Sequence, residues 1–179
     1  MTPQNDFLPD NYKVPDTSNY FKLKDGENTF RILSSAVVGY EYWTNENKPI
    51  RSKTQFTKTP EIRINKDASV SKIKHFWAFV VWNYEAEAVQ ILELTQKTIQ
   101  QDILAIVENK KWGSPQGYDI TITRTGDGLD TEYSVMPNPH AEGDPKIGEA
   151  LRTKTINLNA LFDGTNPFES GTSAQDRAS

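Results

Sequence analysis

The sequence predicts a mainly β domain in which one helix interrupts a series of strands. Segments rich in β-branched and aromatic residues recur between turn signals, which is typical of strands. Residues 96–111 instead repeat their apolar side chains at helical spacing. The chain has 179 residues, which is enough for one domain with a sizeable core and for polar segments at its ends.

The first predicted strand is long and covers residues 27–43. We expect it to bend near Ser34-Ser35 or Gly39. Its apolar and aromatic residues stand in even register, which directs them to one face: Phe30, Ile32, Val38, Tyr40 and Tyr42. A polar and basic excursion follows over residues 45–71.

Residues 72–84 form the strongest predicted strand, and residues 88–95 return beside it as a hairpin. The helix at 96–111 comes next, and a second hairpin joins residues 118–125 to residues 130–136. A helix between the third and fourth of five strands is the element order of an OB-fold. We therefore predict a five-stranded OB-fold barrel with one helix between strands three and four, plus a long basic excursion after strand one.

Composition divides the chain into three parts. Residues 1–26 are polar and proline-punctuated, and we expect an extended leader. Residues 27–139 form the predicted OB-fold domain, with the excursion at 45–71. Residues 140–179 drift toward a Gly-, Ser- and Thr-rich composition, and we expect a polar, largely disordered C-terminal tail.

Several function classes are disfavoured by what the sequence lacks. It has no cysteine and only two histidines, His75 and His140, which stand far apart, so we expect neither disulfides nor a metal site. It has no P-loop, GxSxG or HExxH motif and no nuclease-like acidic cluster. We therefore expect no enzyme and no cofactor. With no export signal and no apolar run of membrane length, we place the protein in a cytoplasm.

The net charge of −4 conceals an uneven distribution. Residues 46–75 hold eight basic residues against three acids, a net charge of +5, whereas the rest of the chain holds 12 bases and 21 acids. Phosphate contacts act within a Debye length of about 8–10 Å, so a local positive field counts for more than the total. The basic excursion is either a solvated loop or the cationic side of a nucleic-acid site.

A binder that accepts any single-stranded sequence needs cations along the phosphates and aromatic faces that stack on unpaired bases. The strand at residues 72–84 begins with Lys72 and Lys74. Aromatic residues follow on both of its faces: Phe76, Trp77, Phe79, Trp82 and Tyr84.

One face of this strand must form core. If the hairpin turn pairs Tyr84 with Glu87, Trp77 and Phe79 face the leucines of the returning strand, and Trp82 faces its polar residues. The wetter face is the better candidate for DNA, which favours Trp82 over Trp77, although an error of one residue in the turn would exchange the two.

A second aromatic group, Tyr40, Tyr42 and Trp43, lies at the end of the first strand, where the excursion begins. These residues either cap the mouth of the barrel or line a binding groove. A groove is expected there because the loop after the first strand of an OB-fold borders the binding site. Phe56, within the excursion, stacks a base or anchors the loop. The complete set of predicted DNA contacts is Tyr40, Tyr42, Trp43, Arg51, Lys53, Arg63, Lys72, Lys74, Phe76, Trp77, Trp82 and Tyr84.

Four stretches carry a resemblance to a known family: ENTFRIL at 27–33, GYEYW at 39–43, KHFWAFVVWNY at 74–84 and YDITITRTGDGLDTEYSVMPNP at 118–139. Here the sequence resembles tailed-phage single-stranded DNA-binding proteins, the counterparts of the gene-32-like helix-destabilising family, without their zinc site. The resemblance implies an OB-fold that protects and presents single strands during phage DNA replication, recombination and repair in the bacterial host cytoplasm. It also implies phage replication or recombination proteins as partners, reached through the C-terminal tail.

Two other classes remain as alternatives. A phage structural protein or protein-interaction module could use the barrel for protein contacts, and it would assemble alone and ignore DNA. A metal-dependent nuclease would need a carboxylate cluster, which the sequence does not show. The favoured hypothesis is sequence-independent binding of single-stranded DNA without catalysis.

Overall fold

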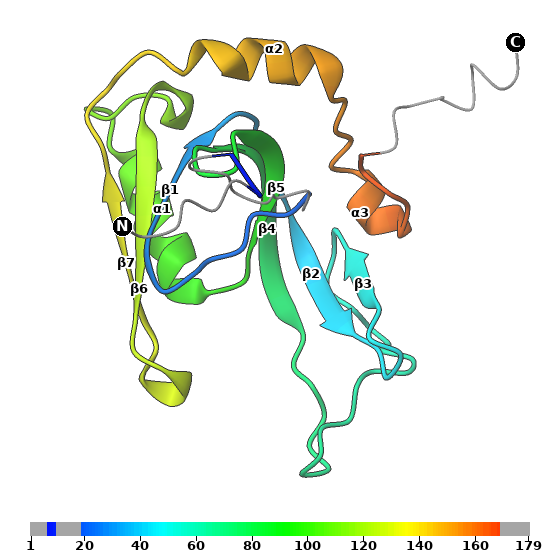
Figure 1. The fold of residues 1–179 in the computed structure, drawn as a ribbon. Helices are drawn as coiled ribbons and strands as arrows, with labels where there is room; N and C mark the ends of the chain where they lie inside the picture. Colours follow the sequence, from blue (N-terminus) through cyan, green and yellow to red (C-terminus); the bar gives the residue numbers. More distant parts are fainter. Residues whose placement is uncertain (1–6, 10–18, 169–179) are drawn as a thin grey trace, which may run out of the picture.

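The computed structural model describes residues 7–9 and 19–168, and within them it contains seven strands and three α-helices (Figure 1). The mainly β fold predicted from the sequence is confirmed. Short 3-10 turns at Pro115–Gly117 and Gly128–Asp130 precede β6 and β7. In chain order the elements are β1 (Gly26–Ile32), β2 (Val37–Trp43), β3 (Pro49–Ser52), β4 (Lys74–Asn83), β5 (Ala88–Leu94), α1 (Lys97–Glu108), β6 (Asp119–Thr125), β7 (Glu132–Pro137), α2 (Pro145–Thr153) and α3 (Ala160–Asp163).

β1 and β2 are the two halves of the long strand predicted for residues 27–43, and both lie along the same edge of β4. Ile32 pairs with Val81 and Val37 pairs with Ala78, so residues 33–36 stand opposite two residues of β4. The stretch is therefore a bulge of two extra residues. Because two is an even number, the residues in even register face the same side before and after the bulge.

The sheet forks at this bulge. β1 carries β6 and then β7 on its free edge, β2 carries β3, and β5 pairs with the opposite edge of β4. In the described residues no pairing joins β5 to β7, so the sheet is open and the predicted closed barrel does not form. One physical reason lies at Ile91 of β5, whose backbone exchanges hydrogen bonds with Asn19 and Phe21 (2.9 and 2.8 Å). The edge that closure would need is occupied there.

The main core lies on the inner face of the fork and is covered by α1. Ile99 and Ile103 of the helix are buried against Phe30 of β1 and Tyr118, which precedes β6. Phe21 also belongs to this cluster, so the last part of the predicted leader packs into the domain. Neither α1 nor any other helix in the described part of the chain is long and apolar enough to cross a bilayer.

The outer face of β4 and β5 packs against residues 145–168, a segment expected from its composition to be largely disordered. α2 buries Ile147 near Trp82, and α3 buries Leu161 near Phe76. The segment has few apolar residues, and its composition therefore indicated disorder. These few residues nevertheless meet a sheet face whose large apolar side chains need cover, and burying that area stabilises the segment.

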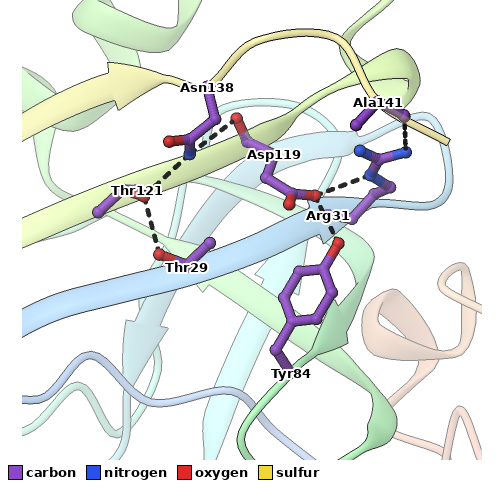
Figure 2. A network of polar contacts seen from close by, with 7 residues as sticks. All are labelled: Thr29, Arg31, Tyr84, Asp119, Thr121, Asn138 and Ala141. Atoms are coloured by element: carbon purple, nitrogen blue, oxygen red, sulfur yellow. Dashed lines mark hydrogen bonds and ion pairs between the residues drawn. The ribbon is translucent and has the colours of Figure 1, made fainter. Parts of the chain in front are cut away.

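A polar network fixes the start of this C-terminal segment (Figure 2). Arg31 is buried and forms an ion pair with Asp119 at 2.8 Å, and its guanidinium also donates to the carbonyl of Ala141 (2.8 Å). The hydroxyl of Tyr84 donates to the same carboxylate at 2.7 Å. β1, β6 and the turn that follows β4 are therefore joined to the chain that leads into α2.

Candidate nucleic-acid interface

The basic excursion leaves the sheet after β2 and projects beyond it before the chain returns as β4 (Figure 1). The Arg63 amide donates to the Trp43 carbonyl at 2.7 Å, and Ile64 forms an antiparallel bridge with Val70. The Arg63 guanidinium also lies over the Trp43 ring, 5.6 Å from its centroid. Two predicted DNA contacts therefore contact each other at the base of the excursion.

Tyr42 anchors the excursion and presents no face to solvent, because its side chain is only 2% exposed. Its ring packs edge-on against Phe56, with centroids 4.8 Å apart, and its hydroxyl donates to the Pro60 carbonyl at 3.2 Å. Of the two roles expected for Phe56, the structure supports the anchor. The prediction that Tyr42 stacks on DNA does not fit this burial.

Arg51 is also occupied inside the protein. Its side chain is 9% exposed and pairs with Glu41 at 3.2 Å and with Glu93 at 2.8 Å. Burial, reinforced by the neighbouring Glu93, raises the pKa of Glu41 to about 8 despite the guanidinium. The predicted phosphate contact of Arg51 is therefore replaced by this buried cluster. Lys53, also predicted to contact phosphate, lies over the ring of Phe162, 5.4 Å from its centroid.

The register of the β4–β5 hairpin agrees with the sequence expectation, since Trp77 pairs with Leu94 and Phe79 with Leu92. The prediction that the face of Trp82 contacts DNA does not fit the structure, because Trp82 is only 1% exposed. Phe76, on that same outer face, has no exposed surface. The covering segment, residues 145–168, could not be anticipated from the hairpin alone.

Tyr84, the third aromatic residue of the outer face, belongs to the polar network of Figure 2. Burial, together with the hydrogen bond to Asp119, raises the pKa of Tyr84 to about 12. The hydroxyl therefore stays a donor at physiological pH, and the residue has a structural role in this arrangement.

Accessible aromatic residues lie instead where the inner face of β2 and β4 runs beyond the core. Trp77 is half-buried and stands opposite Val38, while Tyr40 stands beside His75 with ring centroids 5.2 Å apart. Two hollows of about 440 and 460 Å³ adjoin at Trp77 and at Leu104 of α1. They form one groove between α1 and the β2–β4 face, which we call the Trp77 groove.

Lysines stand at one end of the Trp77 groove and in the chain just before β4. Lys74 and Lys97 line the groove, and Lys72 precedes β4 by two positions; all three are exposed. Within the described residues none of the three forms an ion pair, in contrast to Arg51. The groove therefore combines an accessible indole with cations that are not neutralised by the protein.

The Trp77 groove brings Trp77 and Lys74, both predicted, together with residues that sequence reasoning missed. Lys97 and Leu104 lie on α1, and Val38 lies on β2. A signal for Leu104 existed, because it falls off the buried stripe of the helix yet is large and apolar. Lys97 could be linked to the site only through the packing of α1 beside β4.

No group of three or more histidine or acidic side chains is placed to hold a metal ion within residues 7–9 and 19–168. The acidic side chains of Glu41 and Glu93 both pair with Arg51. The guanidinium of Arg51 supplies the positive charge between these two side chains, and Glu41, whose pKa is raised to about 8, keeps its proton at neutral pH.

A comparison with curated proteins finds a distant relative. The chain is 26% identical over 144 residues to a protein described as a probable ssDNA-binding protein of Escherichia phage T5. The match covers 68% of this chain and 55% of that protein, so the chain spans about half the length of the curated relative it matches. No family model matches the chain, and no solved structure matches it.

Proposed function

We propose that this chain binds single-stranded DNA without sequence preference and without catalysis, and that the strand lies in the Trp77 groove. The observation that carries the proposal is the half-buried indole of Trp77 between two hollows, with free lysines at one end. An indole offers a stacking face that any base can use, and each stack contributes about 1–3 kcal/mol. The relative from phage T5 supports the same ligand through its description.

The order of the strands supports an interpretation as an open form of the OB-fold. The interrupted strand β1–β2 takes the first position, β4 and β5 the next two, and β6 and β7 the last two, with α1 in between. OB-folds bind oligonucleotides beside the loop that follows their first strand. That loop is the basic excursion here, and Lys72 lies at its junction with β4.

The biological setting is part of the proposal. A phage single-strand binder would protect and present exposed DNA during replication, recombination and repair, in the cytoplasm of the bacterial host. We further propose that other replication or recombination proteins are reached through the end of the tail. Residues 169–179, where that contact would lie, fall outside the described residues.

Titration with oligo-dT tests the site. Trp77→Leu should raise the dissociation constant about 5- to 150-fold, the equivalent of one lost stack, and should remove most of the tryptophan quenching. Trp82→Phe is the matched control, because its indole is buried on the opposite face. The three free lysines predict a slope of about −2 in a plot of log K against log salt concentration.

Equal loss of affinity in both variants would contradict the assignment to the Trp77 groove, and absence of binding at low salt would contradict DNA binding altogether. The alternative of a phage structural or protein-interaction module predicts assembly without DNA, which size-exclusion with and without oligonucleotide detects. Incubation of labelled DNA with Mg²⁺ tests for nuclease action, and intact DNA is the expected result.

A further inference from the structure

A second group of rings lies just beyond the end of α1, outside the Trp77 groove. Trp112 follows the helix by four positions, and its indole stacks on the imidazole of His140, with ring centroids 5.9 Å apart and planes 19° from parallel. Tyr118 packs against both rings, and its centroid lies 5.5 Å from that of Trp112 and 5.0 Å from that of His140. We call Trp112, Tyr118 and His140 the Trp112 platform.

The Trp112 platform is fixed from inside the protein and presents His140 to solvent. Tyr118 is fully buried and Trp112 is half-buried, whereas His140 is exposed. The His140 ring also hydrogen-bonds through Nε2 to the Trp112 carbonyl oxygen. The next residue, Ala141, donates its amide to the Gly117 carbonyl at 3.4 Å. His140 is therefore an exposed ring held in a defined position, and histidine is one of the side chains on which unpaired bases stack.

The Trp77 groove leads to this platform along α1. The groove is lined at one end by Lys97, the first residue of the helix, and at the other by Val107 and by residues 114–116, which follow Trp112. A helix of 12 residues, such as α1, is about 18 Å long. Nucleotides stacked as in a DNA strand are about 3.4 Å apart, so about five of them cover the length of the helix.

The surface between the groove and the platform suits a polyanion. Among the residues that the structure describes, no acidic side chain lines either hollow of the groove, and this includes Asp102 and Glu108 of α1. Lys110 and Lys111 come just after α1, are exposed and form no ion pair with any of residues 7–9 and 19–168. Cations therefore stand beyond both ends of the groove, where a phosphate backbone that follows α1 would pass.

We propose that the Trp112 platform is a second stacking site for the same single strand, so that DNA runs along α1 from the lysines beside Trp77 to the exposed ring of His140. The proposal rests on the function proposed above and adds to it the path and length of the strand that one molecule binds. A strand confined to the Trp77 groove would leave His140 without effect on affinity. A strand that follows α1 makes His140 contribute once the oligonucleotide is long enough to reach it.

Oligonucleotide length separates the two sites. His140→Ala should change little the dissociation constant for an oligo-dT of about four nucleotides, the low end of the range that one OB-fold covers. For about twelve nucleotides it should raise the constant about 5- to 150-fold, the equivalent of one lost stack. Trp77→Leu should weaken both, because both oligonucleotides occupy the groove. Unchanged affinity of His140→Ala for the longer oligonucleotide would overturn the proposal.

Two other replacements of His140 distinguish stacking from a structural role. His140→Phe retains a ring without a hydrogen-bonding nitrogen, and it should keep most of the affinity for the longer oligonucleotide. His140→Gln retains a hydrogen-bonding group without a ring, and it should lose about as much affinity as His140→Ala. The opposite order would show that His140 acts only by fixing the chain beside Trp112, and it would refute stacking.

Salt dependence tests the lysines beside the platform. Lys110→Gln combined with Lys111→Gln should reduce the slope of log K against log salt concentration by about 1.4 for the longer oligonucleotide, since each phosphate contributes about 0.7. The slope for the shorter oligonucleotide should not change. Lys22→Gln is the control and should alter neither slope, because Lys22 is an exposed lysine that lines neither hollow of the groove. An unaltered slope in the double variant would contradict the path along α1.

Photocrosslinking maps the path directly. The longer oligonucleotide, with a single 5-iodouracil placed at one position after another, should crosslink from some positions to the peptide that contains Trp77. From positions about five nucleotides away it should crosslink to a peptide that contains Trp112 or His140. Crosslinks to Trp77 alone would overturn the second site and leave the proposed function intact. Absence of binding by the unmodified protein would disprove the proposed function and this extension with it.

Discussion

Replacing Gly39 by alanine gives a sharp test of how β2, β3 and α3 fit together. A Cβ on Gly39 would lie 2.4 Å from the Ser52 carbonyl oxygen and 2.9 Å from the ring of Phe162. The Ser52 oxygen belongs to the backbone of β3 and cannot rotate away, so β3 must shift. Overpacking of this kind costs about 1–3 kcal/mol. For a chain of this length the melting temperature should fall by roughly 2–10 °C.

Thermal unfolding followed by circular dichroism measures this effect. Gly148→Ala in α2 is the matched control, because its Cβ would be 3.8 Å from the flexible end of Arg152. That change should stabilise the protein by about 0.5–1 kcal/mol through helix propensity. A Gly39→Ala protein that melts at or above the unmodified protein would refute the close packing. Because Gly39 adjoins Tyr40, its replacement should also weaken binding to oligo-dT.

Three further predictions concern the buried polar groups. The pKa of Glu41 is raised from 4.5 to about 8, so the folded state keeps a proton that the unfolded chain loses, and the free energy of unfolding should fall as the pH rises between these values. Glu41→Gln retains an acceptor for Arg51 and should flatten the pH dependence of the urea midpoint. An equally steep fall in this variant would contradict the prediction. Arg31→Met should cost about 3 kcal/mol in urea unfolding, because it leaves the Asp119 carboxylate without its cation, and adding Asp119→Asn should recover part of the loss. Tyr84→Phe should cost about 1.5–3 kcal/mol through the lost bond to that carboxylate, and an unchanged midpoint would argue against the network.

The elements that depend on local pattern were predictable from the sequence. The alternation of residues 27–43 predicted one strand with a bend near Ser34-Ser35 or Gly39, and β1 and β2 meet at a bulge at the first of these two positions. A turn that pairs Tyr84 with Glu87 placed Trp77 on the face of Leu92 and Leu94, and the observed register has this arrangement. Both follow from the two-residue repeat of a strand, which short stretches of sequence contain in full.

The accessibility of the candidate site residues was not predictable in the same way. Trp82 and Trp77 lie on opposite faces of one strand, and the sequence marked the face of Trp82 as the wetter one. Residues 145–168, more than 60 positions later, cover that face. Arg51 was removed from the candidate surface by Glu93, another partner distant in sequence. Burial and ion pairing at such distances depend on how the chain returns, which local patterns do not contain.

The sequence by itself determined the two hairpins, the helix between them and the segregation of positive charge into residues 46–75, because each of these depends on residues that are close together in the chain. Only the tertiary structure decided that the sheet stays open, which aromatic face is covered and that α1 forms one wall of the Trp77 groove. These outcomes arise from competition between distant segments for the same sheet edges and faces. Each edge or face is occupied by the segment that buries the most apolar area there without leaving buried polar groups unpaired.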